Sequence, residues 1–280
     1  MKNILSILLF YTGISYILFK LLHRPGTIRI VNYHCTPSID MKSFNIHLKF
    51  FKNHFRNLNY NDLDTFFTSN DTNSRQGIII TFDDGLRTNY DFALPLLEQY
   101  DFTAWFCIPL SFISNPTLQF ADINKITYRQ LYNDFRLAMN IEELIRISNK
   151  HVIICHTNSH HRMNPFDSNL VLKYEIEDSK FDLEKIINKK IEIFCWVGGE
   201  LQHYTKDAYM YIKNVGYKYS FTTNNKLINC FSNKHTLDRT NIESNMPLHL
   251  LLFQLSGIMD FYYTKKRFII NKIFRINDFN

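Results

Sequence analysis

Two short stretches of the sequence carry side chains whose types and spacing can do chemistry. The first is Asp83-Asp84-Gly85, which directly follows the β-branched and aromatic run 78–82. A run of this kind is typical of a short buried strand. Adjacent carboxylates at its end are costly to bury unless a cation, hydrogen-bond donors or a metal ion stabilise them. An ordinary Asx-type turn after the strand is the alternative interpretation of this stretch alone.

The second stretch contains His156 and His160, which follow a predicted short strand at 152–155. A spacing of four residues would place both imidazoles on one face of a helical turn, where they can bind one ion. The carboxyl ends of parallel strands gather at one edge of a sheet, so we expect these histidines to lie near Asp83 and Asp84. Two histidines and a carboxylate, with one position left for water, form the ligand set of a catalytic divalent metal. A solvated polar turn is the alternative for the histidine stretch by itself.

Predicted strands and helices alternate along most of the chain, which favours a parallel α/β organisation. The predicted strands are 27–33, 78–82, 102–108, 152–155, 191–196 and 217–222. Helices are predicted, among others, at 43–58, 126–135 and 248–263.

The bulk composition excludes several classes of protein. At 280 residues the chain is long enough for one large α/β domain, and 25 Phe with 16 Tyr suit a large core or a ring-binding cleft. The formal charge of +6 is scattered, so we expect no nucleic-acid partner. The five cysteines contain no Cys-x-x-Cys pair and do not indicate a disulfide framework. The oligomeric state is not predicted.

The N-terminal segment 4–22 is almost uniformly apolar, with no charge between Lys2 and Lys20. Its length is at the lower limit for a membrane span. We therefore expect residues 1–24 to form a membrane anchor or signal-like helix, either an uncleaved anchor or an interfacial helix, with a cleaved signal peptide as the competing interpretation. Basic residues after the segment, such as Arg24, favour a cytoplasmic body by the positive-inside rule but do not decide the side of the membrane.

The two reactive stretches resemble motifs of the polysaccharide deacetylases, the NodB-like enzymes of carbohydrate esterase family 4. The segment Thr81-Phe82-Asp83-Asp84-Gly85 is similar to their first motif. The segment His156-Thr157-Asn158-Ser159-His160 is similar to their second motif, and about seventy residues separate the two. The resemblance covers roughly residues 27–240.

The resemblance implies an α/β fold, a distorted (β/α) barrel formed by a catalytic domain of residues 25–280 behind an N-terminal hydrophobic helix. It implies a divalent metal ion held by Asp84, His156 and His160. Zinc is the metal that we expect first, and cobalt, nickel and manganese are the alternatives. Asp83 would be the general base that takes a proton from the attacking water.

Two features of the family are not matched directly. The third motif often supplies an arginine to the base, but the corresponding stretch 194–199 has none, and Arg239 is our candidate to replace it. The histidine that serves as the catalytic acid is not recognisable in its usual motif. Trp196 is a candidate to pack on a sugar ring, with a core position as the alternative. The unranked candidates for the acid are His161, His203 and His235.

The sequence thus predicts a membrane-associated, metal-dependent hydrolase that removes N-acetyl groups from the amino sugars of a surface polysaccharide or glycolipid. A catalytically weak carbohydrate-binding relative is one alternative. An esterase or deformylase that acts on another acylated sugar is a second, and a membrane anchor with an interaction role is a third.

Overall fold

Nine strands form one sheet, and seven of them close into a parallel barrel in the computed structural model, which describes residues 2–69, 75–126, 128 and 136–275. The strands of the ring, in spatial order, are β1 (Thr27–Tyr33), β3 (Gly77–Phe82), β4 (Ala104–Ile108), β5 (Val152–Cys155), β6 (Ile193–Cys195), β7 (Tyr219–Thr222) and β9 (Leu237–Asn241), which pairs again with β1. Two short strands flank the ring, β2 (Arg56–Asn57) parallel to β3 and β8 (Ile228–Asn229) antiparallel to β1.

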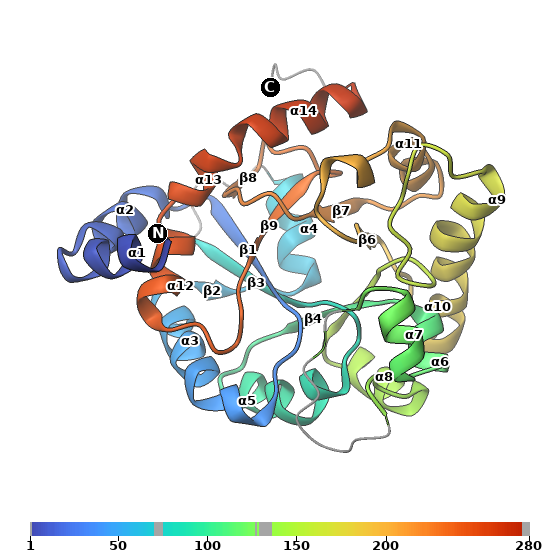
Figure 1. Cartoon of the computed structure of the whole chain (residues 1–280), viewed down its shortest axis with the longest axis horizontal. Helices are drawn as coiled ribbons and strands as arrows, with labels where there is room; N and C mark the ends of the chain where they lie inside the picture. Colours follow the sequence, from blue (N-terminus) through green and yellow to red (C-terminus); the bar gives the residue numbers. More distant parts are fainter. Residues whose placement is uncertain (1, 70–74, 127, 129–135, 276–280) are drawn as a thin grey trace.

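Helices surround the barrel (Figure 1). In chain order they are α1 (Lys2–Tyr11), α2 (Ile14–Leu22), α3 (Met41–His54), α4 (Tyr60–Thr68), α5 (Leu94–Gln99), α6 (Leu110–Ser114), α7 (Leu118–Ile123), α8 (Ile141–Ser148), α9 (Asn169–Leu172), α10 (Ser179–Ile187), α11 (Lys206–Asn214), α12 (Leu248–Leu255), α13 (Ile258–Tyr262) and α14 (Thr264–Phe274). Short 3-10 or π-helical turns lie at Ser38–Asp40, Asn89–Ala93, Lys173–Asp178 and Leu201–His203.

This architecture confirms the predicted distorted (β/α) barrel. The predicted strands 27–33 and 152–155 match β1 and β5. The barrel is distorted because no helix crosses between β7 and β9; the chain returns through β8 instead.

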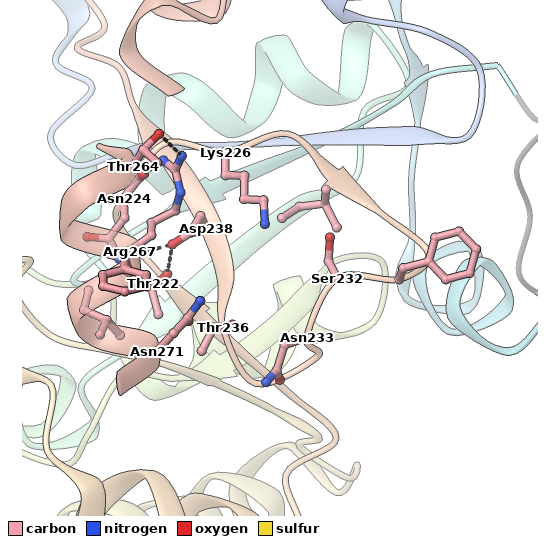
Figure 2. Close-up of a pocket in the computed structure, with 14 residues that line it drawn as sticks. Thr222, Asn224, Lys226, Ser232, Asn233, Thr236, Asp238, Thr264, Arg267 and Asn271 are labelled. Atoms are coloured by element: carbon pink, nitrogen blue, oxygen red, sulfur yellow. Dashed lines mark hydrogen bonds between the residues drawn. The ribbon is translucent and has the colours of Figure 1, made fainter. Parts of the chain in front are cut away.

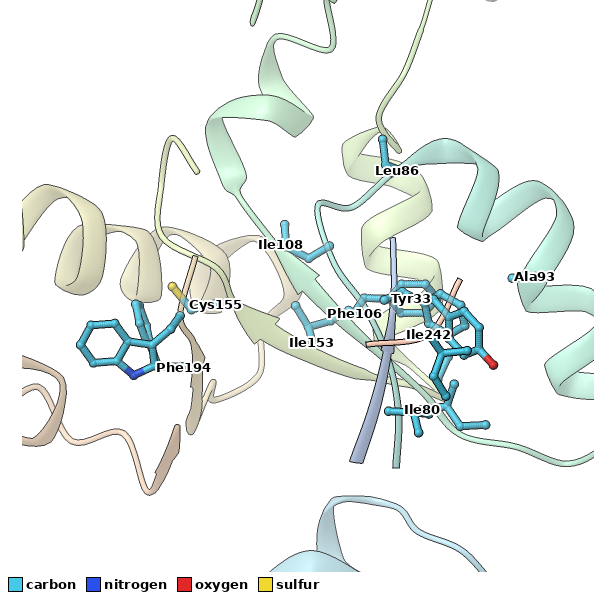
Figure 3. Packing of buried hydrophobic residues seen from close by; sticks show 14 of the residues in the cluster. Tyr33, Ile80, Leu86, Ala93, Phe106, Ile108, Ile153, Cys155, Phe194 and Ile242 are labelled. Carbon is cyan, nitrogen blue, oxygen red and sulfur yellow. The ribbon is translucent and has the colours of Figure 1, made fainter. Parts of the chain in front are cut away.

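Alternation along the strands divides the buried side chains into two sets. One cluster fills the barrel interior and includes Ile30, Ile79 and Ile154. The other fills the layer between the strands and the helices and includes Ile80 and Phe106 (Figure 3). Side chains that continue the inward alternation beyond the strand ends therefore gather at the mouth of the barrel.

The N-terminal segment differs from the single hydrophobic helix that we expected. It forms two helices, α1 and α2, that break at Gly13, whose φ of 75° is left-handed. Among the described residues no single helix has the length and apolar composition to cross a membrane. One pair of helices meets these criteria together, Asn3–Tyr11 and Ile14–Leu22, but the pair is bent by 86°. The assignment of residues 1–24 as a membrane anchor stays a prediction.

Three predicted helices also need comment. The helix predicted at 43–58 ends at His54, where the chain turns into β2. The helix predicted at 248–263 is interrupted at Gly257, whose φ of 88° is left-handed, so α12 and α13 are separate. Most of the helix predicted at 126–135 lies outside the described residues.

Gly85 and Gly216 provide a matched test of the turn that ends β3. Both have left-handed φ values, 61° and 90°, but a Cβ at Gly85 would lie 2.9 Å from Ile113 Cδ1, whereas a Cβ at Gly216 would meet nothing within 4 Å. We expect Gly216→Ala to lower the free energy of unfolding by about 1–2 kcal/mol through backbone strain alone. Gly85→Ala should lower it by about 1–3 kcal/mol more, because the side chains around it must also move. Equal losses in urea unfolding would show that the turn tolerates the added methyl group.

Candidate active site

The two carboxylates lie at the mouth of the barrel because β3 ends there. Asp83 continues the inward alternation of Ile79 and Thr81, and its backbone N–H donates to Tyr33 O at 2.9 Å. The chain then turns sharply, since Asp84 has a left-handed φ of 71°. Both carboxylates are buried, with 2% of Asp83 and 1% of Asp84 exposed. Each therefore needs a favourable partner.

Asp83 finds that partner in Arg239, which reaches it from β9. Arg239 Nη1 donates to Asp83 Oδ1 at 2.5 Å and Nη2 to Oδ2 at 2.9 Å, a bidentate pair between two buried groups. Asn32 Nδ2 also donates to Oδ2 at 3.4 Å. Burial by itself would raise the pKa of the Asp83 carboxyl, but Arg239, with His156 and His34, lowers it to about 2. Asp83 is therefore an oriented anion at neutral pH.

Asp84 is surrounded differently. Its Oδ1 lies 3.1 Å from His160 Nε2 and 3.6 Å from His156 Nε2. Neither of its oxygens has a hydrogen-bond partner among the described residues. Burial opposes ionisation, but the two histidines, when protonated at Nε2, hold the pKa of Asp84 well below its usual range.

Backbone carbonyls fix the orientation of both imidazoles. His156 Nδ1 lies 2.9 Å from Cys195 O, and His160 Nδ1 lies 2.7 Å from Asn124 O. Each Nδ1–H donates to its carbonyl, so Nε2 points toward Asp84 and offers a lone pair to a metal ion when the imidazole is neutral. This is the arrangement that metal-binding histidines commonly have.

The loop that carries these histidines is not the helical turn that we predicted. Residues 156–160 form no helix, and Thr157 and His160 have left-handed φ values of 60° and 62°. Thr157 Oγ1 accepts a hydrogen bond from His161 N at 2.9 Å, which closes the loop. The two rings meet with centroids 5.3 Å apart because of this irregular backbone and not because of helical spacing.

The residues present fit a divalent metal ion. Asp84, His156 and His160 each offer a ligand atom, and these atoms lie within 4.8 Å of one another. A second group, formed by Asp83, His156 and Cys195, meets the same criterion. It is the poorer candidate because Arg239 engages both oxygens of Asp83, whereas both oxygens of Asp84 have no hydrogen-bond donor within the described part of the chain.

A pocket of about 330 Å³ opens over these groups and contains a histidine that lies outside the two sequence motifs. His34 lines the pocket, and its Nε2 lies 3.7 Å from Asp83 Oδ2. A histidine at the end of a predicted strand is more often structural than catalytic, so its position in the sequence alone does not single out His34. The signal that identifies it is the alternation Ile30, Asn32, His34, which places all three on the inward face of β1 and its extension.

The histidines that we considered as catalytic acids lie elsewhere. None of the three is among the residues that line this pocket. His161 Nε2 pairs with Asp167, His203 Nδ1 contacts Met163 O at 3.1 Å, and the ring of His235 packs against Tyr209.

Trp196 lines the pocket but belongs mainly to the core. Only 1% of the residue is exposed, and its ring stacks on Phe274 with centroids 5.5 Å apart. Almost none of the indole is therefore open to a sugar ring. Its role in substrate binding stays a prediction.

A larger cavity, of about 530 Å³, lies outside the barrel between β7, β9 and α14 (Figure 2). Its buried carboxylate, Asp238, accepts hydrogen bonds from Thr222 Oγ1 at 2.5 Å and Asn224 Nδ2 at 3.1 Å. Both groups of potential metal ligands found in the described residues lie at the barrel mouth instead. The smaller pocket is therefore the candidate active site.

A family comparison agrees with this placement. Residues 70–220, more than half of the chain, match the family described as polysaccharide deacetylase. The chain belongs to the polysaccharide deacetylase family. Membership implies a hydrolase that acts on amide bonds. The matched segment contains both reactive motifs, but His34 precedes it and Arg239 follows it.

Solved structures of deacetylases share this fold. The Streptococcus pyogenes deacetylase PplD is 19% identical, with a TM-score of 0.67 over 83% of this chain and 99% of its own. A de-N-acetylase from Aggregatibacter actinomycetemcomitans is 17% identical, with a TM-score of 0.65 over 81% of this chain and 99% of its own. IcaB from Ammonifex degensii is 16% identical, with a TM-score of 0.65 over 84% of this chain and 98% of its own. A comparison with curated protein sequences returns no match.

The ion pair at Asp83 predicts a pH-dependent contribution to stability. The pKa of this carboxyl falls from 3.8 to about 2 on folding, so the pair stabilises the protein above about pH 4 and loses its effect as the pH falls to about 2. The contribution is roughly 2 kcal/mol at neutral pH, and roughly half of it is lost by about pH 3. Asp83→Asn should therefore be destabilised near neutral pH, and its free energy of unfolding should approach that of the wild type as the pH falls.

Urea unfolding in the presence of a chelator measures this effect without a contribution from bound metal. Asp182→Asn, at an exposed carboxylate of α10, is the control and should follow the wild type at every pH. A constant difference between Asp83→Asn and the wild type down to about pH 3 would contradict the lowered pKa.

Proposed function

We propose that the protein is a metal-dependent deacetylase that removes N-acetyl groups from the amino sugars of a surface polysaccharide or glycolipid. The observation that carries this proposal is the difference between two adjacent buried carboxylates. Asp83 is paired with Arg239, while both oxygens of Asp84 lack a hydrogen-bond donor in the described chain. Asp84 Oδ1 lies beside the Nε2 atoms of two imidazoles. One carboxylate is thus arranged to accept a proton and the other to bind a cation.

Asp84, His156 and His160 would hold the metal ion. Two imidazoles and one carboxylate suit zinc, and cobalt, nickel or manganese can occupy ligands of the same kind. Bound there, a divalent cation would acidify a water molecule and polarise the acetyl carbonyl.

Asp83 would act as the general base. Its bidentate contact with Arg239 fixes the carboxylate plane, and Oδ1, which among the described residues accepts from Arg239 alone, keeps a lone pair for the attacking water. The low pKa keeps the group ionised across the neutral range, so the base needs no prior deprotonation. Arg239 therefore positions the base and keeps it in the required charge state.

His34 would protonate the leaving amine. The amine must gain a proton when the carbon–nitrogen bond breaks, and His34 is the imidazole among the described pocket residues that is not assigned to the cation. Its Nε2 lies 3.7 Å from Asp83 Oδ2, so a small movement of the side chain or one bridging water would let it pass on the proton that the base receives from water. Lys266, also in the pocket, donates to Gly199 O instead.

The rest of the pocket is suited to a sugar. Glu200, Thr223 and Asn241 contribute polar side chains around the candidate active site. They can donate to or accept from the hydroxyl groups of a pyranose. These polar side chains support a carbohydrate substrate but do not indicate which polysaccharide or glycolipid it is.

A metal and acetate assay on the purified protein tests the assigned roles. His156→Ala should lose bound metal and activity together, because it removes one of three ligands. Asp83→Asn should keep the metal and release acetate from N-acetylglucosamine oligomers at least about 100-fold more slowly. His161→Ala, in the same loop but paired with Asp167, is the matched control and should retain both properties.

Three outcomes of that assay would contradict the proposal. A protein that binds no divalent metal under any loading condition would contradict the assigned site. A metal-loaded protein that binds the oligomers without releasing acetate would be a carbohydrate-binding relative. Release from O-acetylated or N-formylated sugars alone would favour the esterase or deformylase.

Leaving-group chemistry tests His34 separately. His34→Gln should lower the rate of amide hydrolysis about 100-fold, while an aryl acetate, whose leaving group needs no proton, should be hydrolysed at close to the wild-type rate. Metal content should not change, and His203→Gln, at a histidine that contacts Met163 O, serves as the control. Equal losses for the amide and the aryl ester would show that His34 acts through the structure of the site and not as an acid.

A further inference from the structure

The helices α1 and α2 expose an unusual amount of apolar surface. The exposed large side chains on the two helices, each between 39% and 84% exposed, are Ile4, Leu5, Ile7, Leu8, Tyr11, Ile14, Tyr16, Ile17 and Leu21. An apolar group of this size on one short segment is typical of a surface that contacts a partner or a lipid phase.

The polarity of these helices is inverted relative to a helix on a water-exposed surface. Ser6 and Ser15 are fully buried against the protein body, while leucine and isoleucine side chains face outward. A helix at an ordinary protein surface buries its apolar stripe and exposes its polar residues. The sequence of this segment therefore suits an apolar environment outside the protein.

The body of the protein nevertheless holds the pair in place. Phe19 of α2 is fully buried, and its ring contacts Phe50 and Phe55 with centroid distances of 5.3 and 5.7 Å. In Figure 1 the two helices lie beside α12 at one edge of the barrel. The bend of 86° between them gives the outward face two crossed segments, both packed on the body.

The charge of the segment indicates the kind of partner. Lys20 and Arg24 are exposed at its end, and residues 3–24 contain no carboxylate. Lys20 Nζ lies 5.5 Å from the centre of the Tyr16 ring, so the charge stands beside the apolar face. Basic residues and tyrosine at the border of an apolar face are typical of a helix that lies in a membrane interface.

The neighbouring helix α13 extends this surface toward the candidate active site. A Cβ at Gly257, just before α13, would lie 2.7 Å from Leu22 Cδ2, so the end of α2 touches the start of α13. Phe261 and Tyr262 of α13 are also exposed, and the next residue, Tyr263, lines the pocket.

We propose that the outward face of α1 and α2 docks in the plane of a lipid bilayer that contains anionic headgroups. The apolar side chains would enter the interface, and Lys20 and Arg24 would contact the headgroups. A bilayer fits this face better than a protein partner does, because the face combines a basic border with a complete lack of acidic residues. The docked protein would have the candidate active site, reached through α13, next to the membrane surface.

Vesicle flotation of the full chain tests this inference. Vesicles of phosphatidylcholine alone and vesicles with added phosphatidylglycerol are compared for the wild type and for Leu8→Glu/Ile17→Glu. We expect the wild type to float with both and more strongly with the anionic vesicles, and the double variant to bind at least about tenfold more weakly. Phe166→Glu/Leu170→Glu, at two side chains that are 94% and 79% exposed elsewhere, is the matched control and should bind like the wild type.

Other occupants of the face would give different results. Failure of the wild type to bind either vesicle would overturn the inference. Dimers in sedimentation equilibrium that Leu8→Glu/Ile17→Glu converts to monomers, without vesicle binding, would assign the face to a second copy. Quenching of Ile14→Trp fluorescence by lipids brominated at the bilayer centre, but not by lipids brominated near the headgroups, would mean that the segment inserts deeply instead of lying in the plane.

The test is independent of the proposed deacetylase chemistry. Leu8 and Ile17 lie outside the candidate active site, so acetate release from a soluble oligomer should be equal in the wild type and in Leu8→Glu/Ile17→Glu. Vesicle binding without acetate release would contradict the proposed function alone. Acetate release without vesicle binding would contradict the docking surface alone.

Discussion

The buried ion pair between Asp83 and Arg239 is the interaction on which the rest of the site depends. Two adjacent carboxylates that are both shielded from water repel each other and lose their hydration. The described part of the chain gives one of them a guanidinium, through two hydrogen bonds of 2.5 and 2.9 Å, and gives the other no hydrogen-bond donor. Removing one member of such a pair typically costs about 3–5 kcal/mol, because the remaining charge is left buried without a partner. The same pairing that stabilises Asp83 leaves Asp84 in need of a second cation, and that asymmetry gives the two neighbours different roles in the proposed reaction.

Closure of the barrel makes this pairing possible. The ring places β9 beside β1 and β1 beside β3, so an inward-facing side chain of β9 can reach the end of β3 across one intervening strand. Arg239 also donates to Thr81 Oγ1 at 3.0 Å, which ties it to the inward face that leads to Asp83. The family match ends at residue 220, so the cation comes from a part of the chain beyond the matched segment. A change in the register of β9 by one residue would turn Arg239 out of the barrel and leave Asp83 unpaired.

The sequence predicted those features of the fold and the site that depend on local residue patterns. The β-branched runs predicted β1 and β5 with their observed bounds, and the position of polar residues directly after buried strands predicted that Asp84, His156 and His160 would meet. Features set by non-local packing were missed. His34 matters because β1 and β3 are neighbours in a closed ring, and a single strand end does not reveal that. Thr157 and His160 have left-handed backbone although neither is a glycine, so the residue types do not predict this conformation. The spacing of four residues between His156 and His160 therefore suggested a helical turn. The break at Gly13 separates two helices that both contact α12, an arrangement that an apolar run alone does not predict.

The central claim is that Arg239 keeps Asp83 ionised while Asp84 and the two histidines hold the cation. The most direct measurement is the pH dependence of kcat/KM for acetate release by Arg239→Met, with metal content determined on the same sample. Without the guanidinium, burial is the largest influence on Asp83 and raises its pKa. The acid limb of the profile should therefore move upward by about one pH unit or more, with the metal content unchanged. An acid limb at the wild-type position, or loss of the metal together with the activity, would contradict this division of roles.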